Sequence, residues 1–206
     1  MLFNSFSFLA FLAVFLILYY RLTHRGQNFL ILVASYFFYA AWDWRFLILL
    51  AFTTYVDYFV ARRMEIETNA KSRRTLLGVS LVCNLGMLGF FKYFDFFAVN
   101  LQGLLKAIGF NVELPLLNLI LPVGISFYTL HSLGYVLDVY SRRQPPVKSA
   151  LEFGCFVSFF PLLVAGPILR IATMRKQFSE SCPMVVHKAQ IESGVCLILI
   201  GYFQKL

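Results

Sequence analysis

Long apolar runs, separated by short polar segments, make up most of the chain. A helix of about 20 apolar residues matches the hydrocarbon thickness of a bilayer, so runs of this kind predict membrane helices. We predict apolar helices at residues 6–20, 27–41, 46–61, 75–91, 119–140 and 189–203. The predicted fold is an all-α integral membrane protein, a multi-pass helical bundle that forms one membrane domain over residues 1–206.

Basic residues gather between the apolar runs and predict an orientation. Residues 62–74 and 141–149 are strongly charged connections. We expect both to be cytoplasmic loops, because cytoplasmic loops are enriched in Lys and Arg. Arg21 and Arg25 follow the first apolar run, which places that end in the cytoplasm and the N-terminus on the outer side.

The weaker apolar stretch at 94–110 decides whether this orientation is consistent. If it crossed the bilayer, the helix at 119–140 would end on the outer face and would carry Arg142 and Arg143 there. This would reverse the usual distribution of basic residues. We therefore predict that residues 94–110 form a re-entrant or interfacial segment that does not span the membrane.

A second irregular region follows the 141–149 loop. The apolar run at 151–164 is short for a span, and Pro161, Gly166 and Pro167 interrupt it or its continuation. We predict a broken or re-entrant helix pair here. Backbone groups freed by such breaks can line a cavity within a membrane protein.

Polar side chains in the 119–140 helix form the candidate functional site. Tyr128, His131, Tyr135 and Asp138 are three or four residues apart, so they share one helix face. They either bond neighbouring helices together or line a substrate passage. Arg170, beyond the interrupted region, either lies at a cavity mouth or binds a lipid phosphate. These five are our candidate passage residues, and we assign no catalytic residue to this chain.

Asp57 lies within the apolar run at 46–61. A carboxylate inside a span costs about 2.5–3.5 kcal/mol on insertion scales, so it should face the bundle and have a polar partner. Its role is either a structural hydrogen bond or a direct part in function.

Composition agrees with a membrane protein and narrows the partners. Hydrophobic residues are 60% of the 206 and charged residues 14%, against about 25% charged in soluble domains. The net charge of +8 lies between apolar runs, so we expect contact with membrane lipid and no nucleic acid. The spacing of the four cysteines suits neither zinc nor a redox pair, and we expect no metal. They are Cys83, Cys155, Cys182 and Cys196.

Several segments together carry a resemblance to a known family. They are NFLILVASYFFYAAWDWRFL, LGFFKYFDFF, LILPVGISFYTLHSLGYVLDVYSRR and FVSFFPLLVAGPILR. On these segments the chain resembles the membrane-bound O-acyltransferases, specifically the bacterial alginate O-acetyltransferase membrane subunit and its relatives. The resemblance implies the N-terminal half of a ring of tilted helices around a pore, with broken or re-entrant helices.

The resemblance also implies an activity and its partners. An enzyme of this family moves an acyl group from a cytoplasmic thioester donor, such as acetyl-CoA, across the membrane. The group goes to an exopolysaccharide such as alginate or to a periplasmic acetylation partner. No covalently bound cofactor is implied. The implied location is the bacterial inner membrane.

One feature of the family is missing from this chain. The family's catalytic histidine belongs to a Trp-His segment, whereas Trp42 and Trp44 here have no His beside them. We therefore expect the N-terminal portion of a longer enzyme, inactive without its C-terminal half. The resemblance implies Gln or Glu at the position of His131, which we do not assign as the catalyst. A D-alanyl transferase acting on teichoic acid, or a non-enzymatic transporter or scaffold, remain alternatives.

Overall fold

The structure, a computed structural model, describes residues 5–110, 120–164, 166–167, 169–178 and 188–205. Helices are the regular elements of these residues, which contain no strand. They are α1 (Phe6–Tyr19), α2 (His24–Asp43), the 3₁₀ helix η1 (Trp44–Phe46), α3 (Leu47–Ile66), α4 (Ala70–Ala107), α5 (Ile125–Tyr140), α6 (Ala150–Ser158), α7 (Phe160–Leu163), α8 (Ile171–Phe178) and α9 (Lys188–Lys205). The predicted all-α fold is confirmed.

Polar residues in the connections cap the helices that follow them. Asn69 Oδ1 accepts a hydrogen bond from the Lys71 N–H at 2.9 Å, at the start of α4. Ser149 Oγ accepts one from the Glu152 N–H at 3.3 Å, at the start of α6. Each oxygen satisfies an N–H group that has no partner within its own helix.

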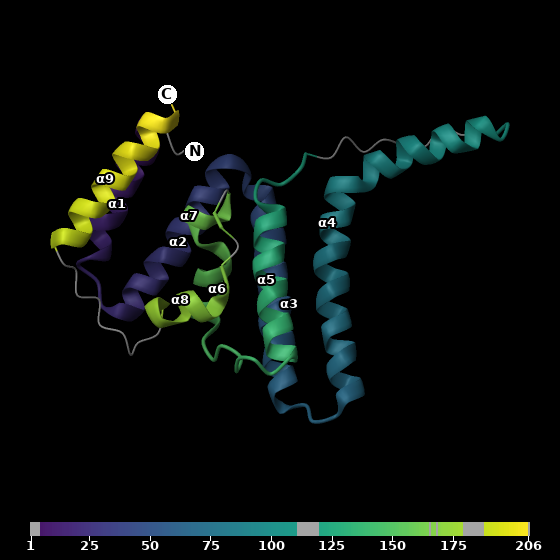
Figure 1. The fold of residues 1–206 in the computed structure, drawn as a ribbon, viewed down its shortest axis with the longest axis horizontal. Coiled ribbons are helices and arrows are strands. Elements are labelled where there is room, and N and C mark those ends of the chain that lie inside the picture. The colour runs from purple at the N-terminus through teal and green to yellow at the C-terminus, as the bar shows by residue number, and fades with distance from the viewer. Residues whose placement is uncertain (1–4, 111–119, 165, 168, 179–187, 206) are drawn as a thin grey trace.

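The helices run back and forth between two ends of the molecule (Figure 1). α3, α5 and the first part of α4 each contact the other two, while α2 packs against α6. The end of α3, the start of α4 and the end of α5 all lie at the lower edge of Figure 1. The predicted orientation requires the charged connections at 62–74 and 141–149 to share one side, and this arrangement meets that requirement.

α4 differs from the prediction because it is one helix. Its 38 residues cover both the predicted span at 75–91 and most of the separate segment at 94–110. At about 1.5 Å per residue it is about 57 Å long, nearly twice the hydrocarbon thickness of about 30 Å. In Figure 1 it bends, and its last part runs away from α3 and α5. The polar residues between the two segments do not interrupt the helix, because neither Pro nor Gly is among them.

The first charged connection is also shorter than predicted. α3 continues to Ile66 and α4 begins at Ala70, so 67–69 are the linking residues of the predicted 62–74 loop. Arg, Lys, Met and Glu have high helix propensity, which lets both helices extend beyond their apolar parts. The second connection, 141–149, matches the prediction at both ends.

The predicted helix break after residue 150 is confirmed. α6 ends at Ser158, and Phe159 leaves the helical conformation with a ψ of 107° before the short α7. The Phe160 N–H donates to Ser35 Oγ of α2 at 3.2 Å, so the break does not leave this donor unpaired. Pro161 has no N–H to satisfy. The break is therefore supported by α2 as well as by its own sequence.

Gly124 brings the start of α5 against the end of α7. Its φ of 78° lies in the left-handed region, and a Cβ at this position would be 2.3 Å from the Leu163 carbonyl oxygen. A side chain here would therefore meet both backbone strain and a direct clash. Because the backbone of Gly124 is left-handed and not helical, α5 begins at Ile125, later than the predicted helix at 119–140.

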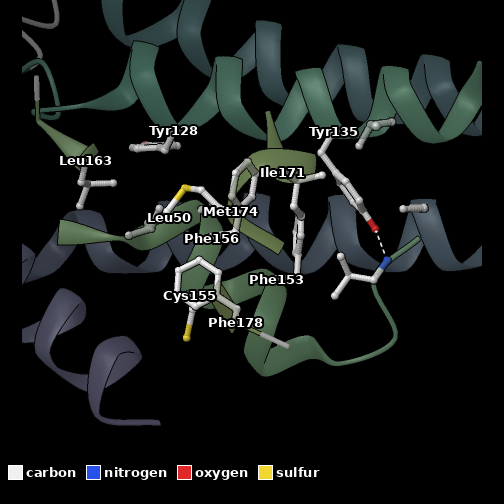
Figure 2. Packing of buried hydrophobic residues seen from close by; sticks show 14 of the residues in the cluster. Leu50, Tyr128, Tyr135, Phe153, Cys155, Phe156, Leu163, Ile171, Met174 and Phe178 are labelled. Atoms are coloured by element: carbon white, nitrogen blue, oxygen red, sulfur yellow. Dashed lines mark hydrogen bonds between the residues drawn. The ribbon is translucent and has the colours of Figure 1, made fainter. Parts of the chain in front are cut away.

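Aromatic and aliphatic side chains from α3, α5, α6 and α8 fill the core (Figure 2). Apolar side chains also cover the outside, such as Val82, which is 73% exposed, and Phe97, which is 65% exposed. Two helical segments, His24–Ile66 (α2 through α3) and Ala70–Ala107, are long and apolar enough to cross a membrane. An apolar exterior of this kind suits lipid rather than water.

Candidate functional site

Asp57 of α3 is fully buried and joins three helices. Its carboxylate accepts hydrogen bonds from Ser80 Oγ at 2.5 Å and from Asn84 Nδ2 at 2.8 and 3.0 Å, both on α4. It also accepts one from Ser132 Oγ of α5. The prediction that Asp57 faces the bundle and has a polar partner is confirmed. Because Ser132 must face α3 and α4, these bonds fix the rotation of α5 about its axis.

His131, the neighbour of Ser132, holds the segment between α7 and α8. Its ring is 3% exposed, and the Leu169 N–H donates to its Nε2 at 3.1 Å. A backbone N–H can only donate, so Nε2 is the acceptor and the neutral ring carries its proton on Nδ1. The Pro167 carbonyl oxygen is 3.3 Å from the same nitrogen. His131 thus positions the backbone that leads to Arg170.

Tyr135 and Asp138 continue the polar face of α5 toward the charged end of the bundle. Tyr135 Oη accepts a hydrogen bond from the Val147 N–H at 3.0 Å, which ties the 141–149 connection to α5 (Figure 2). Asp138 is 3.8 Å from Arg143 at its nearest atoms, and its side chain is 9% exposed against 65% for Arg143. Asp138 is therefore a mostly buried carboxylate with an exposed cation beside it.

Four of the five predicted passage residues line one pocket. It has a volume of about 260 Å³ and lies between α5 and the segment that leads into α8. His131, Tyr135 and Asp138 line one side and Arg170 lines the other. The helical spacing correctly placed the first three on one face. Their meeting with Arg170 depends on the broken helix, which carries Arg170 back to α5.

Tyr128 occupies a different environment from the other four. Its side chain is fully buried in the apolar cluster near Leu50 and Leu163, and it is not among the residues that line the pocket (Figure 2). The structure therefore brings Tyr128 to the core and not to the pocket.

Arg73 is a residue whose importance sequence reasoning missed. It lies in the charged segment that we expected to be a solvated loop, yet it is 8% exposed. Its guanidinium donates to the Met64 carbonyl of α3, and to the Val139 and Tyr140 carbonyls of α5 at 3.3 and 2.8 Å. It thus caps the C-termini of two helices, where the helix dipole also stabilises a positive charge. No signal in the sequence separates Arg73 from the other basic residues beside it.

The pocket can orient a polar ligand, and its residues define no complete catalytic centre. Arg143 and Arg170 offer charged donors, and Asp138 offers an acceptor. His131 Nε2 already accepts the Leu169 N–H, so that nitrogen is not available as a general base. The described residues at this site therefore suit the binding and positioning of a ligand.

Known proteins match the chain over most of its length. These relatives confirm the resemblance to the membrane-bound O-acyltransferases, because they are named as O-acetylases or as an O-acetyltransferase. The chain is 41% identical over 98% of its length to a probable alginate O-acetylase of Pseudomonas aeruginosa, and 39% identical over 86% of its length to one of Azotobacter vinelandii. It is also 34% identical over its whole length to a peptidoglycan O-acetyltransferase of Helicobacter pylori.

The matched region is less than half of each relative. The chain covers 38% of the P. aeruginosa protein, 35% of the A. vinelandii protein and 44% of the H. pylori protein. No protein-family profile matches the chain. No solved structure matches it either.

Proposed function

We propose that the chain is part of an O-acetyltransferase that moves an acetyl group from a cytoplasmic thioester donor, such as acetyl-CoA, across the membrane to a polysaccharide. The observation that carries the proposal is the 41% identity, over nearly the whole chain, to a probable alginate O-acetylase. The pocket between α5 and Arg170 supports it, because it gathers the charged side chains of Asp138, Arg143 and Arg170 in an otherwise apolar protein.

In this reaction a hydroxyl of the acceptor attacks the thioester carbonyl, an ester forms, and the carbon–sulfur bond breaks. The proton of the hydroxyl leaves to a base, and the thiol departs. We assign the pocket residues to binding: Arg170 and Arg143 hold an anionic part of a substrate, and Asp138 accepts a hydrogen bond from it. The base belongs to the remainder of the enzyme, since His131 is engaged by Leu169.

Two acceptors fit the relatives. An exopolysaccharide such as alginate, reached directly or through a periplasmic acetylation partner, follows from the alginate O-acetylases. The H. pylori relative instead suggests the glycan hydroxyls of peptidoglycan as the acceptor. The 41% identity to the first group against 34% to the second favours an exopolysaccharide.

The same proposal includes a location. The chain lies in the bacterial inner membrane as a multi-pass protein with its N-terminus in the periplasm and its charged connections in the cytoplasm. Its partners are membrane lipid and the C-terminal half of the same enzyme, which completes the ring of helices. No cofactor is bound covalently.

The test is deletion of the full-length gene in its host, followed by complementation. Alkali-released acetate is measured separately from purified exopolysaccharide and from purified peptidoglycan. Loss of acetate from exopolysaccharide, restored by the wild-type gene, is the expected result. Loss from peptidoglycan alone would assign the second acceptor, and unchanged acetate in both would refute an O-acetyltransferase.

Variants then test the pocket. Arg170→Ala should lower acetate incorporation about tenfold, because a hydrogen bond to a charged group is worth about 1.5–3 kcal/mol. Arg74→Ala is the matched control: Arg74 is exposed on α4 and lines neither this pocket nor the one described below. Equal effects of the two substitutions, at equal protein levels in the membrane, would remove Arg170 from the site.

A further inference from the structure

A second pocket, of about 360 Å³, lies at the charged end of the bundle. The end of α3, the start of α4 and the turn after α5 form its walls, and it shares no lining residue with the first pocket. Arg73, Arg142, Glu65 and Gln144 are the polar residues that line it. Nothing in the proposed acyl transfer uses this site.

The backbone of Arg142 is unusual. Its φ is 54°, and it is the residue other than glycine with a positive φ in the described part of the chain. The Arg142 N–H bonds to the Val139 carbonyl at 3.1 Å, and the Arg143 N–H to the Asp138 carbonyl at 3.0 Å. This pair of bonds defines a Schellman cap at the end of α5, in which the left-handed position usually belongs to glycine. An arginine here is strained, so its side chain needs a reason to be present.

The charges around the pocket leave that side chain without an acidic partner. Glu65 is bound to Arg62 at 2.7 Å, and Arg73 is occupied by the carbonyls of α3 and α5. Arg142 is exposed and forms no ion pair with any residue that the structure describes. A guanidinium has five N–H donors and no acceptor, so an anion with several oxygens suits it best. The amide of Gln144 can add one more donor.

The size of the pocket indicates the kind of anion. A water molecule occupies about 30 Å³ in the liquid, so 360 Å³ holds far more than one small ion. A phosphate with an organic group attached fills such a space better than free phosphate does. The Pro145 and Pro146 side chains, which also line the pocket, offer an apolar surface to that group.

We propose that this pocket binds a phosphate ester, with Arg142 as the residue that contacts the phosphate and Arg73 as a positioning residue that holds the ends of α3 and α5 in place. A phospholipid headgroup and a soluble phosphorylated compound carry the same chemistry. The site does not depend on the acyltransfer reaction, so it can fail or succeed independently of that function.

The experiment uses the full-length protein in nanodiscs of phosphatidylcholine. In one arm phosphatidylglycerol replaces part of the lipid, and native mass spectrometry measures how much remains bound. In the other arm glycerol 3-phosphate is titrated in solution, and binding is followed by the rise in unfolding temperature. Retained phosphatidylglycerol alone assigns a lipid headgroup, and binding of glycerol 3-phosphate assigns a soluble ester.

Arg142→Gly is the decisive variant because it relieves the backbone strain while removing the guanidinium. We expect it to unfold no earlier than the wild type and to weaken phosphate-ester binding about tenfold, the effect of losing one charge-assisted contact. Arg74→Ala removes the same charge at the same end and should change binding less than about twofold. The proposal is overturned if neither probe binds the wild type, if Arg142→Gly binds as well as the wild type, or if Arg74→Ala weakens binding equally.

Discussion

Substitution of Asp57 by alanine should weaken the packing of α3 against α4 and α5. The change removes the acceptor that Ser80, Asn84 and Ser132 share on two other helices, and Asn84 Nδ2 keeps only its bond to the Ser80 carbonyl at 3.0 Å. In soluble proteins each unpaired buried donor costs about 1–3 kcal/mol. Hydrogen bonds measured in a membrane protein average only about 0.6 kcal/mol, because the unfolded chain in the bilayer finds other partners.

The second value is the relevant one for this apolar bundle. Three bonds at about 0.6 kcal/mol predict a loss of about 2 kcal/mol. The alanine variant also avoids the burial of a carboxylate, which opposes any larger loss. We therefore expect Asp57→Ala to lower the free energy of unfolding by about 2 kcal/mol, and Asp57→Asn to lower it by less, because the amide keeps one acceptor oxygen.

The measurement is unfolding of the full-length protein in mixed micelles as the fraction of dodecyl sulfate rises, followed by helical circular dichroism. Thr53→Ala is the matched control. Thr53 is buried on the same helix, but its hydroxyl donates to the Leu49 and Leu50 carbonyls of its own helix at 3.1 Å. We expect it to change the free energy of unfolding by less than about 0.5 kcal/mol.

A double-mutant cycle isolates the contact between helices. Asp57→Ala and Ser132→Ala together should destabilise the protein less than the sum of the two single changes, by about 0.6–1.7 kcal/mol. A coupling below about 0.3 kcal/mol, the usual error of additivity, would show that the two side chains do not support each other and would refute the reasoning.

Two further changes test other contacts. Gly124→Ala should cost about 1–2 kcal/mol from its left-handed backbone alone, and the clash against Leu163 adds to this cost. Gly134→Ala is the control, because a Cβ there has open space around it. The Gly124 variant should unfold at a lower temperature than the Gly134 variant. Arg73→Ala should expose 67–69 and 141–149 to protease, because it removes the guanidinium that joins helix-end carbonyls of α3 and α5. Arg73→Lys should restore only part of the protection, since a point charge cannot span both helices.

The helices were predictable from the sequence where an apolar run is long enough for a membrane helix. The spans around α1, α2, α3 and α5 follow from apolar runs, and the break after Ser158 follows from Pro161. The continuity of α4 was not predictable in the same way. The polar residues at 92–95 suggested a boundary, but polarity does not end a helix whose neighbouring turns still form their hydrogen bonds.

The site was predictable where it depends on helical spacing and not where it depends on contacts between distant segments. Spacing alone places His131, Tyr135 and Asp138 on one face of α5, and the structure shows them along one pocket. Spacing cannot show that Tyr128, on the same face, ends in the core, because that depends on where α7 packs. The role of Arg73 depends on the meeting of α3 and α5, which are far apart in sequence.

The consecutive attachments of α5 have a consequence for how its length can vary among related chains. His131 is bonded to the segment before α8 on one side, and Ser132 to Asp57 on another. Each residue turns an α-helix by about 100°. A one-residue insertion between Ile125 and His131 would therefore either rotate Gly124 away from Leu163 or pull both bonds apart. Natural length differences in this region are therefore expected outside α5, in the 141–149 connection.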